Sequence, residues 1–227
     1  MNTIRLCVGA ACALTLLYTA PAGAATVKGV ISTPKKAGAP EAIKVTKDHA
    51  ICGAKPLTKE EMLVSGAGGL KNAVVIIEGA GKAAPGKGGI AQQGGRFEPH
   101  VITLPAKSKL EIKNNDGISH NFHSFGFEND PVNFSQPGEM KVKVVDKGFD
   151  YPEVIKIQCD IHEWMNAWIV VSDESAVAVT GADGSFSIAN IKPGNYTVKV
   201  WHEKLGEVTQ KVTVKDGDNQ VNVALGK

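Results

Sequence analysis

The sequence predicts an all-β protein built from two consecutive β-sandwich units. Short segments with alternating or β-branched residues recur along most of the 227 residues. Turn-forming residues separate these segments, and the chain contains 25 glycines and 11 prolines. Short strands at regular spacing, joined by such turns, are typical of sandwiches and barrels.

The N-terminus has the pattern of a secretory signal peptide. Arg5 precedes the apolar run Leu6–Tyr18, and Ala22–Ala24 fits the small-residue cleavage rule. We therefore predict a cleaved signal at residues 1–24 and a periplasmic or secreted protein. A membrane or lipid anchor, the latter at Cys12, is the alternative. The run is shorter than the roughly 20 residues that cross a bilayer, and no second run is long enough, so we expect no membrane span.

Charge argues against nucleic acid as a partner, and the motif content argues against nucleotide binding. The formal net charge is +2, without a block of Lys and Arg. Gly81–Lys87 matches a phosphate-binding motif, but the residues after it supply neither the Ser or Thr nor the helix that such a loop needs. We interpret residues 79–95 as a long glycine-rich surface loop.

Residues 25–70 are predicted to form an N-terminal extension with short strands. Thr26–Ser32 alternates between apolar and polar residues, and Ile43–Thr46 could form a second strand. Thr58–Glu61 offers a capping box for one short helix.

Residues 71–171 are predicted to form the first complete sandwich. Its first strand is expected at Asn72–Glu78, a continuous β-branched run suited to a buried position. The other expected strands are His100–Leu104, Lys109–Lys113, Glu139–Val145, Val154–Gln158 and Ala167–Val171.

Residues 172–227 are predicted to form a second, smaller β-unit. A unit of this size is marginal alone, so we expect it to pack on the first or to borrow the N-terminal strand. Its expected strands are Ala176–Thr180, Phe186–Ile188, Tyr196–Trp201, Val208–Val214 and Gln220–Leu225.

The segment Cys159–Met165 carries the chemistry of a metal site. It reads C-x2-H-x2-M, so that Cys159, His162 and Met165 share one loop between two expected strands. A thiolate, an imidazole and a thioether are the ligands that suit copper in both oxidation states. Hard cations such as calcium prefer oxygen ligands.

A second imidazole is expected from His120, just after the Lys109–Lys113 strand. Two histidines, a cysteine and a weak axial methionine are typical of an electron-transfer copper centre. Zinc is the main competitor for Cys and His, but structural zinc takes four such ligands and does not favour methionine. The sequence thus predicts one copper ion held by His120, Cys159, His162 and Met165.

The segment Asn114–Phe122, followed by C-x2-H-x2-M, resembles the copper sites of cupredoxins such as plastocyanin, pseudoazurin and amicyanin. The resemblance implies a Greek-key sandwich with a type 1 copper at one end. It also implies a redox partner protein, an electron route through the edge of His162, and a structural role for Asn121 in tying the two ligand-bearing loops together.

The whole chain is similar to exported plastocyanin-like proteins of the methylamine-utilisation type, which join a cupredoxin to a small carboxypeptidase-regulatory-like β-domain. Trp201–Glu203 and the D-G-x-F pattern at Asp183–Phe186 carry this comparison. Related chains carry a cysteine near Gly95 that would pair with the equivalent of Cys52. The resemblance therefore implies that Cys52 has no disulfide partner here.

The expected function is single-electron transfer outside the cytoplasm, without enzymatic activity. The alternative is a periplasmic copper-binding or delivery module without a redox circuit. Copper enzymes of this type need paired H-x-H ligands and a second cupredoxin domain, whereas this chain has His120 and His123 as H-x2-H.

The remaining histidines leave alternatives open. His123 could be a solvated side chain or could bind a second metal with His100. His202 and Glu203 could form a structural turn or a metal site, and the turn is favoured.

Overall fold

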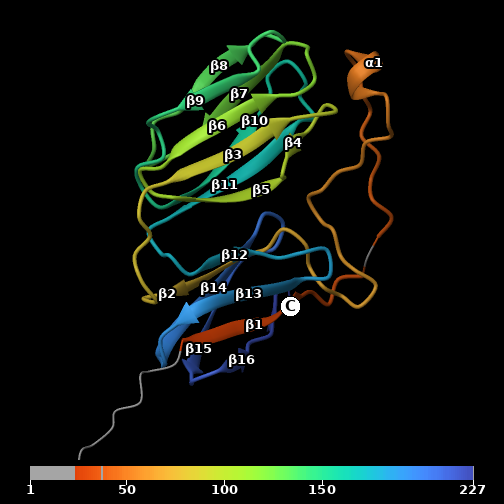
Figure 1. The fold of residues 1–227 in the computed structure, drawn as a ribbon. Coiled ribbons are helices and arrows are strands. Elements are labelled where there is room, and N and C mark those ends of the chain that lie inside the picture. The colour runs from red at the N-terminus through yellow and green to blue at the C-terminus, as the bar shows by residue number, and fades with distance from the viewer. Residues whose placement is uncertain (1–23, 37, 227) are drawn as a thin grey trace, which may run out of the picture.

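In the computed structural model, which describes residues 24–36 and 38–226, the chain forms two β-sandwiches stacked end to end (Figure 1). The predicted signal peptide lies outside the described residues apart from Ala24. The one helix among the described residues is the short α1, His49–Cys52. None of the helical structure described is long and apolar enough to cross a membrane.

The first sandwich contains a five-stranded sheet in the order β5-β11-β10-β7-β8 and a four-stranded sheet in the order β4-β3-β6-β9. Neighbouring strands are mostly not consecutive, the order expected of Greek-key connections. The strands are β3 (Lys87–Gln92), β4 (Phe97–Glu98), β5 (Val101–Pro105), β6 (Lys109–Asn114), β7 (His120–Phe125), β8 (Asn133–Gln136), β9 (Val142–Val145), β10 (Glu153–Gln158) and β11 (Asn166–Ser172).

Period-two alternation places the core of this sandwich between its sheets. In β6, Leu110 and Ile112 are fully buried, as are Ile155 and Ile157 in β10. Successive strand residues face opposite sides of a sheet, so each strand contributes every second side chain to one apolar layer. The same core cluster includes Cys159, which follows β10 directly.

The second sandwich pairs the sheet β12-β2-β14-β15 with the sheet β13-β1-β16, and β17 also pairs with β1. Its core is almost entirely aliphatic. The strands are β1 (Ala25–Ser32), β2 (Val74–Glu78), β12 (Val177–Val179), β13 (Ser185–Ile191), β14 (Gly194–His202), β15 (Gly206–Val214), β16 (Asp218–Gln220) and β17 (Val223–Ala224).

Two strands lie in a different unit from the one predicted for them. β2, predicted to open the first sandwich, pairs instead with β12 and β14 of the second. β1, assigned to the extension, pairs with β13, β16 and β17. The C-terminal unit thus borrows the N-terminal strand, one of the two arrangements expected, and also takes β2, because both strands add apolar area that the small unit lacks.

Local sequence missed the strands β3, β7 and β8, and it predicted a strand at residues 43–46 and a helix at Thr58–Glu61 that do not form. Residues 79–95 contain β3, whose glycine-rich sequence has low strand propensity but is paired on both sides, with β4 and β6. In residues 43–46 no strand forms, and Thr58 makes a bridge to Ala42 instead of starting a helix. β7 and β8, which pair antiparallel, were not predicted.

A small apolar cluster joins the two sandwiches. Val74 of β2 packs with Val101 and Val170 of the first sandwich. Next to them, the Trp168 and Trp201 rings meet edge to face, with 5.3 Å between their centroids. The junction is therefore packed through apolar side chains.

Candidate metal centre

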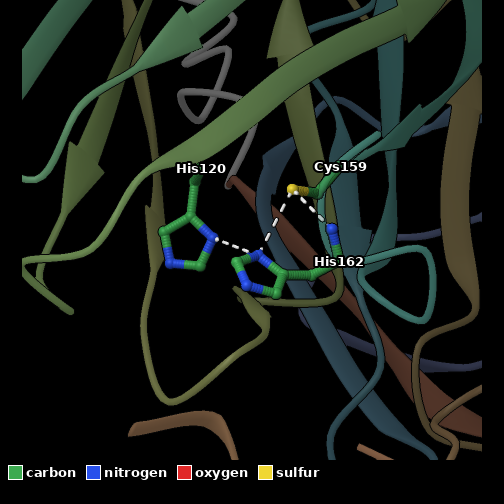
Figure 2. Close-up of side chains that lie close together, drawn as sticks. All are labelled: His120, Cys159 and His162. Carbon is green, nitrogen blue, oxygen red and sulfur yellow. Dashed lines mark hydrogen bonds between the residues drawn. The ribbon is translucent and has the colours of Figure 1, made fainter. Parts of the chain in front are cut away.

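Three predicted ligands meet at one end of the first sandwich. His120 begins β7, and Cys159 and His162 lie on the loop between β10 and β11 (Figure 2). Their potential ligand atoms all lie within 4.8 Å of one another, and all three side chains are buried. The Nδ1 atoms of His120 and His162 are 3.1 Å apart, and Nδ1 of His162 is 3.7 Å from Sγ of Cys159.

Carboxylates fix the orientation of both imidazoles. Nε2 of His120 lies 2.9 Å from Oδ2 of Asp116, and Nε2 of His162 lies 2.7 Å from Oδ2 of Asp48. When Nε2–H donates to a carboxylate, the Nδ1 lone pair is left free for a ligand. Both Nδ1 atoms point toward the other ligand-bearing side chains, as a shared metal would require (Figure 2).

The sulfur of Cys159 lies in an environment that favours its thiolate. The backbone amides of Asn121 and His162 donate to Sγ at 3.3 and 3.4 Å. Burial opposes ionisation, but the contact with His120 and these amides outweigh it and lower the pKa of Cys159 to about 7. Burial likewise opposes charge on His120, yet Asp116 and Cys159 raise its pKa to about 9.

Met165 closes the loop that carries Cys159 and His162. The amide of Cys159 donates to the carbonyl of Met165 at 3.1 Å, and the amide of Met165 donates to the carbonyl of His162 at 2.8 Å. The Met165 side chain is 1% exposed and belongs to the same core cluster as Cys159. Its predicted axial role stays a prediction.

Asn121 links the two ligand-bearing segments, in the way the cupredoxin resemblance implies. Its Oδ1 accepts from the amide of Asp160 on the Cys159 loop at 3.1 Å. Its Nδ2 donates to the carbonyl of Phe134 on β8 at 3.1 Å. The side chain thus fixes the Cys159 loop relative to β7 and β8.

The N-terminal segment around α1 covers the centre. Besides the contact of Asp48 with His162, Nζ of Lys47 donates to the carbonyl of Ile161 at 3.2 Å. The His162 side chain is fully buried. Asp48, more than a hundred residues away in the chain, thus lies against the edge of His162, and the predicted electron route through that edge stays a prediction.

Gly95 connects this covering segment to the rest of the centre. Its amide donates to Oδ2 of Asp116 at 3.0 Å, and its carbonyl accepts from Nε1 of Trp164 at 3.1 Å. A Cβ at Gly95 would lie 2.7 Å from Cβ of Cys52. Cys52 and Cys159 are both free, as the sequence led us to expect for Cys52. Burial is the main cause that raises the pKa of Cys52 to about 11.

His123 and His100 have different partners and do not form a metal site together. His123 pairs with Asp160 and stacks on Phe125, while His100 pairs with Glu203 at the junction between the sandwiches. His202 is buried beside Glu203. These contacts favour the structural interpretations of all three.

Sequence reasoning missed the two carboxylates that hold the imidazoles. Asp116 lies in the segment that carries the cupredoxin resemblance, four residues before His120, so its spacing offered a signal. Asp48 offered none, because its neighbours in sequence predict no site and only the tertiary fold brings it to His162.

Comparison with known proteins finds one domain family in the C-terminal part of the chain. Residues 165–226 match the model of the carboxypeptidase regulatory-like domain, and the C-terminal part of the chain carries such a domain. The match starts at Met165, so it includes β11 and omits β1 and β2, which complete the sandwich. No curated protein matches the chain.

The solved structures that resemble the chain include copper proteins. A copper-containing nitrite reductase from Thermus scotoductus is 22% identical with a TM-score of 0.32, over 41% of this chain and 24% of that one. A purple cupredoxin from Nitrosopumilus maritimus is 18% identical with a TM-score of 0.31, over 37% of this chain and 99% of its own. A copper(I) amicyanin variant is 14% identical with a TM-score of 0.32, over 43% and 98%. This overlap is too partial to transfer a property from any of these proteins to this chain.

Proposed function

We propose that this protein is an exported type 1 copper protein that carries single electrons between redox partners. The observation that carries the proposal is the buried cluster in which the Cys159 sulfur meets inward-facing Nδ1 atoms of His120 and His162. A thiolate and two imidazoles from separate loops are the donor set of electron-transfer copper sites.

The separations of the donor atoms fit one shared ion. Nitrogen and sulfur ligands lie about 2.0–2.3 Å from a transition metal, so two of them on one ion lie roughly 3–4 Å apart. The 3.1 Å and 3.7 Å separations in the cluster fall in this range. A copper ion bound there would supply a Cu(I)/Cu(II) couple, and buried Met165 on the same loop is the proposed axial ligand.

The surrounding residues hold the donors still. Backbone amides of Asn121 and His162 fix the sulfur, and carboxylates of Asp116 and Asp48 fix the rings. Donors that are held in one arrangement rearrange little when the charge at the site changes, which favours fast electron exchange.

The pattern at residues 1–24 supports a periplasmic or secreted location for this activity. The partner would be another redox protein. Within the described residues there is one such cluster of ligand atoms.

Copper delivery without a redox circuit remains the competing function. A delivery module has to release its metal to a partner through exchange of accessible ligands. Here the side chains of His120 and His162 are fully buried, and the Asp48 segment covers the latter. Slow release of copper is therefore expected, which favours the carrier.

The test is the visible and EPR spectrum of the mature protein loaded with Cu(II), compared with two serine variants. Cys159→Ser should abolish the intense thiolate-to-copper band and the narrow hyperfine splitting. Cys52→Ser replaces the other free cysteine and should keep both. A pale wild-type protein, or a band that survives in Cys159→Ser, would overturn the ligand assignment.

A further inference from the structure

We propose that Asp48 is a positioning residue for His162, and that the segment around α1 exists to deliver this carboxylate and thereby favour Cu(II) over Cu(I). The inference rests on the proposed function and assigns it a residue outside the predicted ligand set. It is carried by the backbone of Asp48, the anchoring of its segment and the chemistry of a carboxylate on a ligand imidazole.

The side chain of Asp48 does not make the capping hydrogen bond that is usual at its position. Asp48 stands immediately before α1, where an aspartate normally accepts hydrogen bonds from the first helical amides. Here it makes no such capping bond and adopts the left-handed conformation, with φ 49° and ψ 44°. Its Oδ2 lies 2.7 Å from Nε2 of His162 instead. Such strain persists where the surrounding structure enforces it, and it concentrates at functional sites.

Contacts on both sides of Asp48 hold the segment in place. Lys47 donates to the carbonyl of Ile161, the residue before His162. On the other side, fully buried Cys52 packs against Gly95, which in turn binds Asp116. Figure 1 shows how far the chain travels to reach this position: β1 lies in the second sandwich, and α1 lies beside the far end of the first. The segment therefore spans the molecule to reach the metal centre.

The carboxylate has a defined chemical effect on the ring it binds. A carboxylate that accepts from Nε2–H makes Nδ1 a stronger donor and adds negative charge near the metal, which stabilises the more highly charged oxidation state. Asp116 does the same for His120, so each ligand imidazole has its own carboxylate. The Asp48 side chain is 44% exposed, so solvent screens its charge. We therefore expect its effect on metal affinity to lie at the lower end of the range for carboxylates that bind a ligand histidine.

The experiment compares Asp48→Asn with Asp216→Asn, which removes an equal charge from an exposed position in the second sandwich. Affinities for Cu(II) and Cu(I) are measured by competition with chelators, and the midpoint potential by redox titration. Asp48→Asn should weaken Cu(II) binding about tenfold, weaken Cu(I) binding less, and raise the midpoint potential, while keeping the thiolate band. Asp216→Asn should match the wild type in all three.

A second readout needs no copper. In the metal-free protein, NMR should show a slowly exchanging Nε2 proton on His162 that exchanges fast in Asp48→Ala. Equal losses of Cu(I) and Cu(II) affinity, or a midpoint potential unchanged from Asp216→Asn, would overturn the inference while leaving the copper assignment intact. A wild-type protein without the type 1 spectrum would instead overturn the proposed function, and the proton-exchange comparison would still decide whether Asp48 holds His162.

Discussion

The two sandwiches differ in how they are assembled and in what they bury. The first is formed by one continuous stretch, from β3 to β11, whereas the second combines β1 and β2 with strands from the C-terminal quarter of the chain. The first buries a set of polar side chains around the candidate metal centre: Gln92, Asn114, His120, Asn121, Gln136 and His162. The second buries fewer polar side chains (Thr33, Asn72, Thr180 and His202) beside a hydrophobic core that is almost purely aliphatic.

This difference separates the roles of the two units. Burying polar groups costs free energy unless each finds a partner, so their concentration in one sandwich marks where function resides. Asn114 and Gln136 donate to backbone carbonyls, and the histidines pair with carboxylates. The second sandwich, packed through Trp168 and Trp201, supports the first without contributing to the cluster.

The largest effect is expected where β1 crosses the second sandwich. A Cβ at Gly29 would lie 1.7 Å from the carbonyl oxygen of Val221, so Gly29→Ala forces the backbone apart. We expect a loss of about 3 kcal/mol in the free energy of unfolding of this sandwich. Chemical denaturation followed by tryptophan fluorescence measures it, and the copper spectrum should be unchanged. Gly86→Ala, at an open position, is the control and should change stability by less than about 0.5 kcal/mol. A loss of the copper band in Gly29→Ala would show that the metal site depends on the stability of the second sandwich.

A smaller effect is expected at Gly95, where the covering segment meets the metal centre. Gly94 and Gly95 both have positive φ, 59° and 71°, but only a Cβ at Gly95 would collide with Cys52. Gly94→Ala should cost about 1 kcal/mol from backbone strain alone, and Gly95→Ala about 2–3 kcal/mol. Thermal unfolding measures both, and Cu(II) affinity should fall only in Gly95→Ala. Equal losses of stability in the two variants would show that the contact between position 95 and Cys52 does not affect stability.

The smallest effect is a pH dependence of the junction between the sandwiches. Burial lowers the pKa of His202 below 6.5, so the stability it contributes is complete above pH 6.5 and is lost as the pH falls through its folded pKa. Burial opposes charge on Glu203, but His100 and Trp168 outweigh it and lower its pKa below 4.5, so its contribution is lost on further acidification. Metal-free protein should therefore unfold at lower temperature between pH 6.5 and pH 5, and less steeply in His202→Gln. The control His49→Gln changes an exposed histidine and should follow the wild type. A wild-type profile that is flat over this range would contradict the prediction.

The all-β fold, most strands and the cluster of three ligands could be predicted because local sequence encodes them. Alternation specifies strands such as β6 and β10, and the ligand loop from Cys159 to Met165 is a contiguous motif. His120 follows from the need for a second imidazole on another strand.

Features that depend on pairing between distant segments could not be predicted. β3 is a strand because β6 and β4 flank it, not because KGGIAQ favours extended structure. β2 has the apolar run expected of any buried strand, and nothing in it specifies which sandwich it enters. Asp48 reaches His162 only through the path of the whole N-terminal segment.

The position of β1 also sets an order of events during synthesis. Among the described strands β1 is made first, yet its partners β13, β16 and β17 are among the last. Everything that surrounds the candidate metal centre, from Asp48 to β11, is made before these three strands. The first sandwich can therefore fold early with its cover in place, whereas β1 has to stay unpaired until the final strands appear.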